Sequence, residues 1–185
     1  MALLAAEDAL KSAESQCRID LDVQRALNEG FGAARAELAA AREIDSVAIA
    51  YSVATGAAEL PKDAGLAAER RHERIKNALV HHVEIVIRRN ETKYFEVLAS
   101  LLDHRADLVD VAVRMRREYV AKLSAPILQF EQTAGMSLEK GSITAVLVAL
   151  AAEQREAARQ IRAGQRHRLG DIPVDTKFRR TLNLL

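Results

Sequence analysis

The feature that most constrains the fold is a run of 60 residues, 66–125, that contains neither glycine nor proline. These two residue types most often interrupt helices and form turns. As a single helix the run would extend about 90 Å, at 1.5 Å per residue. That length would not fit within a compact domain of this size. The sequence therefore predicts an elongated helical protein, or else a turn near Asn90, Glu91 and Thr92, whose side chains could cap a second helix.

An eleven-residue repeat of apolar side chains favours one continuous helix. Eleven residues in three turns correspond to about 3.67 residues per turn, so such side chains stay on one face of a nearly straight helix. We expect this face to be buried, although Asn90 interrupts it and Pro126 is expected to break or kink the helix. A bundle of shorter helices is the alternative. The series comprises Ile75, Val86, Val97, Leu108, Tyr119 and Phe130, and Leu79, Leu101, Ala112 and Leu123 follow four positions after its members.

The flanking segments also predict helices. The chain holds 34 alanines, 8 glycines and no tryptophan, a composition typical of helical proteins. Residues 2–58 have apolar side chains at three- and four-residue steps, with a kink or short break expected at Gly30 and Gly32. A third helix is expected from about Leu138 or Ser142, a potential N-cap, to about Ala163. The predicted fold is all-α: an elongated, antiparallel, coiled-coil-like bundle of about three long helices, which forms oligomers. Residues 1–169 are expected to form a single domain, followed by the tail 170–185.

The sequence carries no recognisable targeting or membrane segment. Acidic residues interrupt the apolar N-terminus, and the longest apolar stretch, 143–152, is half of the roughly 20 residues that span a bilayer. The lone Cys17 has no partner for an internal disulfide. We therefore expect a soluble, intracellular protein.

Catalytic motifs are missing from the sequence, and we predict that the protein is not an enzyme and holds no cofactor or metal. The nearest approach to a metal site is Glu69 with His72, three residues apart on one helix face, and the adjacent Glu73. Di-iron bundles need two such Glu-x-x-His pairs. The sequence has no second one, so a metal-dependent bundle enzyme ranks third among the possible functions.

A basic stripe is the most suggestive polar feature. Its arginines are spaced by four, three and four residues, which places them on one helix face where they repel one another unless an acidic partner is present. That partner could be the acidic first segment through residues such as Glu37 or Glu43, an anionic surface, or another protein. Residues 1–59 carry 10 acids and 5 bases, whereas residues 141–185 carry 4 acids and 8 bases. The predicted partner-binding residues are Arg155, Arg159, Arg162, Arg166, Arg168, Lys177, Arg179 and Arg180.

Two charge-free stretches, 46–58 and 141–152, are the other candidates for contact with a partner. The first contains alternating apolar residues between Val47 and Val53, which is typical of a strand, but its alanines favour a helix. Helices this apolar must be covered on several faces, either by the chain itself or by a second copy.

We expect a non-enzymatic helical scaffold or subunit of a larger assembly, with copies of itself or other subunits as partners and no small-molecule substrate. The alternative is a protein that binds an anionic membrane or nucleic acid through the basic stripe. In architecture alone, three long helices resemble BAR-type membrane-curving dimers and helical subunits of secretion or virion assemblies. That resemblance implies either of these two functions.

Overall fold

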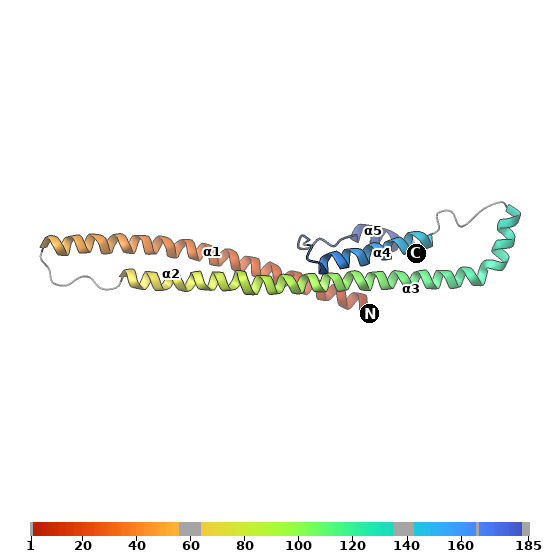
Figure 1. The fold of residues 1–185 in the computed structure, drawn as a ribbon, viewed down its shortest axis with the longest axis horizontal. Coiled ribbons are helices and arrows are strands. Elements are labelled where there is room, and N and C mark those ends of the chain that lie inside the picture. The colour runs from red at the N-terminus through yellow and green to blue at the C-terminus, as the bar shows by residue number, and fades with distance from the viewer. Residues whose placement is uncertain (1, 56–63, 135–142, 166, 183–185) are drawn as a thin grey trace. The chain divides into compact units, whose positions relative to one another are not determined.

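The computed structural model describes residues 2–55, 64–134, 143–165 and 167–182 of the 185-residue chain. The described residues form helices, turns and short connecting segments, without a β-strand (Figure 1). The predicted all-α class is therefore confirmed. Some predicted features lie outside the described residues: the start of the third helix at Leu138 or Ser142, the side chains of Leu123 and Phe130, and Arg166 in the basic stripe.

Helix α1 spans Ala2–Thr55 without interruption. The predicted break at Gly30 and Gly32 is wrong, since both glycines lie within the helix. Each glycine costs about 1 kcal/mol relative to alanine, and the alanine-rich neighbouring turns tolerate that cost. The segment from Val47 to Val53 is helical despite its strand-like alternation, as the alanine content predicted.

The run without glycine or proline is helical throughout. Helix α2 (Ala64–His81) passes directly into the π-helical segment η1 (His82–Ile87), and α3 follows from Arg88 to Ala134. The possible turn at residues 90–92 is absent because these residues lie inside α3. We expected a break or a kink at Pro126. The helix continues beyond Pro126, so there is no break, and the α3 ribbon bends towards its C-terminal end (Figure 1).

The π-helical segment accounts for part of the difference between the predicted and the observed buried face. Hydrogen bonds from residue i to i+5 give a π turn more residues than an α turn, so the apolar positions that follow are displaced along the sequence. After η1 the most buried residues lie one position beyond several of the predicted ones. The pairs of predicted and observed positions are Val97 and Leu98, Leu108 and Val109, and Ala112 and Val113.

The members of the eleven-residue series therefore differ in burial. Leu101 is fully buried, as predicted, whereas Leu79 and Val86 are half-buried. Leu108 and Tyr119 are exposed, at 40% and 65% of their surface, so their predicted burial is wrong for the single chain.

The described chain divides into two compact units. The first combines residues 1–14 with residues 92–185. Here α3 packs with α4 (Ile143–Arg162) and α5 (Asp175–Leu182), and the predicted tail thus contains a helix. Val174, just before α5, has a φ of 62°, a left-handed conformation that is unfavourable for a β-branched residue. The core of this unit includes Ala106, Val109, Val113, Leu147, Leu150, Ala151 and Phe178.

The second unit comprises residues 15–91 and contains most of α1, together with α2 and η1. Its small buried cluster brings Leu38 and Ala41 of α1 against Ala68 of α2. A β-carbon built on Gly65 would lie 2.3 Å from Asp45 Oδ2, so Gly65 permits a close approach of the two helices.

Candidate functional site

The basic stripe on α4 is matched by carboxylates of α3 in the same unit. Arg155 Nη2 lies 2.5 Å from Asp110 Oδ2 and 3.1 Å from Asp107 Oδ1. The hydrogen bond to Asp110 raises the pKa of Arg155 above its ordinary value, Asp107 adds to this effect, and partial burial opposes it. Arg155 therefore carries its charge at any physiological pH.

Several other basic residues of the predicted set also have acidic neighbours. Arg162 Nη2 lies 2.5 Å from Asp103 of α3, and Lys177 of α5 pairs with Glu153 of α4. Arg155 and Arg162 therefore pair with carboxylates of α3 and not with Glu37 or Glu43 of α1. Two residues pair within their own helix, Arg159 with Glu156 at 2.7 Å and Arg179 with Asp175 at 2.8 Å, whereas Arg168 and Arg180 are exposed.

A buried arginine that the sequence reasoning missed anchors α5. Arg105 is 1% exposed, and its Nη1 lies 2.7 Å from Asp175 Oδ1. Its Nη2 is 3.6 Å from Glu7 Oε1, and its guanidinium carbon lies 4.6 Å from the centre of the Phe178 ring. The contact with Asp175 is close but lacks the geometry of a hydrogen bond. Arg105 thus joins residues near both ends of the chain, and nothing in its sequence context distinguishes it from the solvated arginines.

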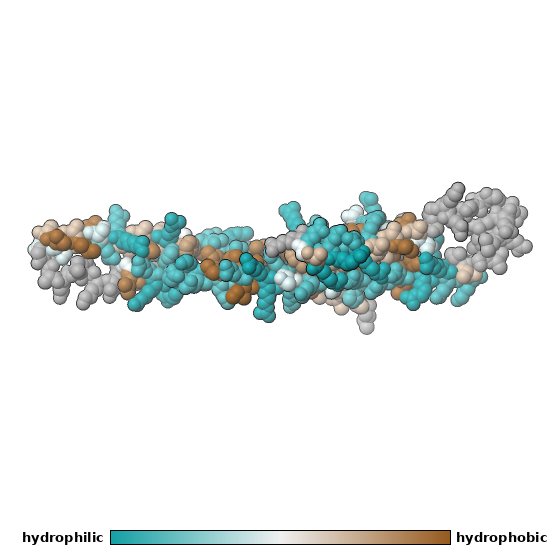
Figure 2. Space-filling view, viewed as in Figure 1, coloured by the Kyte–Doolittle hydropathy of each residue, from teal (hydrophilic) through white to brown (hydrophobic). Residues whose placement is uncertain are grey.

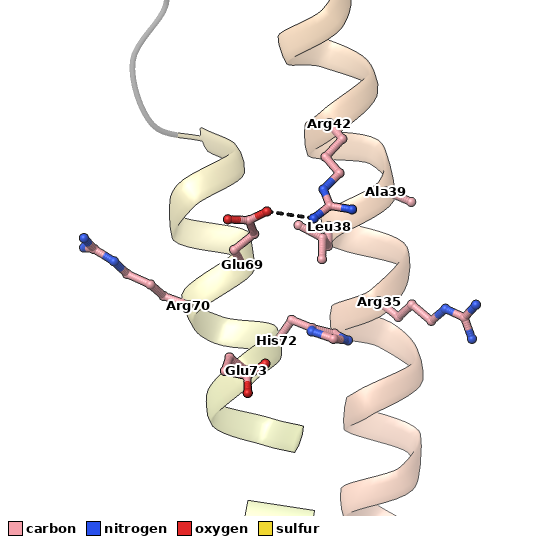
Figure 3. Close-up of a pocket in the computed structure, with 8 residues that line it drawn as sticks. All are labelled: Arg35, Leu38, Ala39, Arg42, Glu69, Arg70, His72 and Glu73. Atoms are coloured by element: carbon pink, nitrogen blue, oxygen red, sulfur yellow. Dashed lines mark hydrogen bonds and ion pairs between the residues drawn. The ribbon is translucent and has the colours of Figure 1, made fainter. Parts of the chain in front are cut away.

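Glu69 and His72, the nearest approach to a metal site in the sequence, lie beside an open groove between α1 and α2 (Figure 3). Glu69 accepts a hydrogen bond from Arg42 at 2.7 Å, and the His72 ring packs at 4.9 Å from the Phe31 ring. The groove measures about 650 Å³, but Arg35 and Arg70 point away from it on opposite sides. Its charged groups therefore do not converge on a common point where a ligand could bind.

No group of three or more His, Cys, Asp or Glu side chains in the described ranges is arranged to hold a metal ion. Glu69 and His72 thus lack a further ligand there. Their observed contacts, an ion pair and a ring contact, are those of helix packing.

A buried polar cluster lies where η1 packs against α1. The carboxylate of Asp20, which is 4% exposed, accepts hydrogen bonds from Asn90 at 2.7 Å and from Gln16 at 3.1 Å. The Nε2 atom of His82 lies 2.8 Å from the backbone carbonyl oxygen of Asp20. The sequence signal was Asn90, a polar residue at a position where the repeat requires an apolar one. These hydrogen bonds provide partners for polar groups beside the π-helical segment.

An exposed row of large apolar side chains lies near the C-terminal end of α1 (Figure 2). Ile44, Val47 and Tyr51, here called the α1 stripe, follow one another at steps of three and four residues and thus share one face. Their exposed fractions are 65%, 64% and 70%. The described residues do not provide the cover that we expected for this charge-free stretch.

A second exposed row, the α3 stripe, consists of Leu108, Val111, Met115 and Tyr119. These residues also follow at steps of three, four and four, on a face of α3 next to the one that packs in the core. The charge-free start of α4 is covered on one face only, since Leu147 and Leu150 are buried whereas Val146 and Val148 are 44% and 45% exposed.

None of the helices in the described ranges has a stretch that is long and apolar enough to cross a bilayer. Comparison with protein-family models, with curated proteins and with solved structures gives no significant match to the chain.

Proposed function

We propose that the protein is a non-enzymatic helical scaffold, or a subunit of a larger protein assembly, built as an antiparallel coiled-coil bundle. The observation that carries this proposal is the α1 stripe. Its three large apolar side chains share one helix face, and two of them, Val47 and Tyr51, lie in the segment 46–55, which has no charged residue.

Water covers the α1 stripe in the single chain, so burial of its apolar side chains would be favourable. Burial of one Val, Ile or similar side chain contributes about 1.5–3 kcal/mol relative to full exposure. Single exposed apolar residues are common on protein surfaces, but contiguous apolar patches mark sites of protein contact. A protein partner that covers the α1 stripe would recover this free energy.

The alternative, binding to an anionic membrane or nucleic acid, has less support. Arg155 and Arg162 are neutralised by α3 carboxylates, and Lys177 is neutralised by Glu153. An anionic ligand would have to compete with these ion pairs. The exposed Arg168 and Arg180 are too few for a strong electrostatic surface.

The proposal is tested by size fractionation of the chain in extracts of the cells that produce it. We expect the parent to elute in a complex far larger than 20.3 kDa. The variant Tyr51→Glu should elute at a smaller size while keeping the parent's helical content. The control Val80→Glu, at an exposed valine of α2 that lies outside both stripes, should elute like the parent.

Two results would count against the proposal. One is elution of the parent as a monomer in the extract. The other is salt-sensitive co-sedimentation of the purified parent with anionic liposomes, without any large complex, which would favour the alternative.

A further inference from the structure

We propose that the α1 stripe of one copy binds the α3 stripe of a second copy, so that copies associate head to tail. This inference rests on the proposed function and names the partner of the α1 stripe. Both surfaces are exposed in the single chain, and both belong to helices that are packed on another face.

The two stripes match in spacing. Steps of three and four residues separate Ile44, Val47 and Tyr51, and the same steps separate Leu108, Val111 and Met115. Apolar residues at this spacing let side chains of one helix fit between those of another, as in coiled coils.

The charges beside the two stripes are opposite in sign. Residues 43–55 include two acids, Glu43 and Asp45, and no base. Residues 108–122 include four bases and two acids. Charge complementarity of this kind favours the correct partner and orientation. The bases are Arg114, Arg116, Arg117 and Lys122, and the acids are Asp110 and Glu118.

The same charges oppose a symmetric contact. Two α1 stripes face to face would bring the acids of both copies together, and two α3 stripes would bring together an excess of bases. A contact between the α1 stripe of one copy and the α3 stripe of another avoids both repulsions. The two surfaces of one junction differ, so an assembly of any length has a free α1 stripe at one end and a free α3 stripe at the other. Such association gives open chains or closed rings.

The test measures the mass of purified protein by light scattering over about a hundredfold range of concentration, because weak association depends on concentration. The parent should rise above 20.3 kDa as concentration increases. Val47→Glu, in the α1 stripe, and Val111→Glu, in the α3 stripe, should each remain at the monomer mass. Val80→Glu is the matched control, since Val80 is an exposed valine of α2 outside both stripes, and it should associate like the parent.

A mixture of the two defective variants provides the decisive measurement. The intact α3 stripe of Val47→Glu can bind the intact α1 stripe of Val111→Glu, and no second junction can form. An equimolar mixture should therefore give a complex of two chains and nothing larger. Circular dichroism of each variant checks that it is folded, and the pair Tyr51→Glu with Met115→Glu repeats the experiment if either valine variant is not.

Several results would overturn the inference. The inference fails if the parent stays monomeric at every concentration. It also fails if Val47→Glu or Val111→Glu associates with itself as strongly as the parent does. A mixture without the two-chain complex would also contradict it. If the parent is monomeric when pure but occurs in a large complex in cell extracts, the head-to-tail contact fails while the proposed function stands. If it is monomeric in both, both proposals fail.

Discussion

The first turns of α3 and the end of α1 are both rich in apolar residues, yet the leucines of the first are buried and the large apolar side chains of the second are exposed. Leu98, Leu101 and Leu102 have no exposed surface, whereas Ile44 and Val47 each expose more than 60% of theirs. Both segments are helical and follow the same three- and four-residue spacing. Periodicity therefore identifies an apolar face, but burial depends on whether the chain supplies a second element to cover it.

The largest expected effect separates these two regions directly. Leu101→Ala removes a fully buried side chain and should lower the free energy of unfolding by about 2–5 kcal/mol. Ile44→Ala, at a side chain that is 65% exposed, should change it by less than about 0.5 kcal/mol in dilute solution. Urea unfolding followed by circular dichroism measures both. Equal losses in the two variants would show that the contrast in burial does not exist in solution.

A smaller effect is expected from the buried arginine, which belongs to the covered region although it is charged. Arg105→Met leaves Glu7 and Asp175 without their shared cation and removes the contact with Phe178. The two carboxylates are 32% and 26% exposed, so water partly hydrates them. We therefore expect a loss of about 1–3 kcal/mol, below the full cost of an unpaired buried charge.

The control for this variant is Arg168→Met, at an exposed residue of the same unit, which should have almost no effect on urea unfolding. If Arg105→Met were as stable as this control, the guanidinium would not be anchoring α5.

The smallest effect concerns the ion pairs at the edge of the covered region. The side chain of Arg155 is 42% exposed, and those of Asp107 and Asp110 are 73% and 44% exposed. Arg155→Gln should therefore cost about 1 kcal/mol or less. The difference from the parent should shrink in 1 M salt, where the Debye length is about 3 Å. A loss that salt leaves unchanged would indicate packing of the arginine stem rather than charge, and Arg180→Gln serves as the control.

The sequence predicted the helices well because helix formation depends on local features. Alanine content and the absence of glycine and proline between Gly65 and Pro126 indicated helix in this run, and the eleven-residue repeat favoured one helix over a turn at residues 90–92. The exact buried face was less predictable, because the extra residue of the π segment displaced burial from Leu108 to Val109. Nothing local to residues 82–87 marks that change, which depends on contacts such as the one between His82 and the Asp20 backbone.

The charged residues show the same limit. The spacing of Arg155 and Arg162 correctly indicated that they require acidic neighbours, but composition pointed to α1, whereas the described carboxylates lie on α3. Arg105 gave no signal, since its burial arises from Glu7 and Asp175, which are far from it in sequence. Which helices meet is a property of the tertiary fold, and a single sequence does not encode it as a readable pattern.

The contacts of Arg105 also impose an order on folding during synthesis. Chains emerge from the ribosome starting at the N-terminus, and contacts between distant residues form late. Glu7 and Arg105 are both available long before Asp175 and Phe178 are translated. During that interval the guanidinium lacks the ring and the closer of its two carboxylates. The first unit therefore reaches its native arrangement only after Asp175 and Phe178 have been translated, and a nascent chain stalled before residue 175 would expose this part of α3 to water and to chaperones.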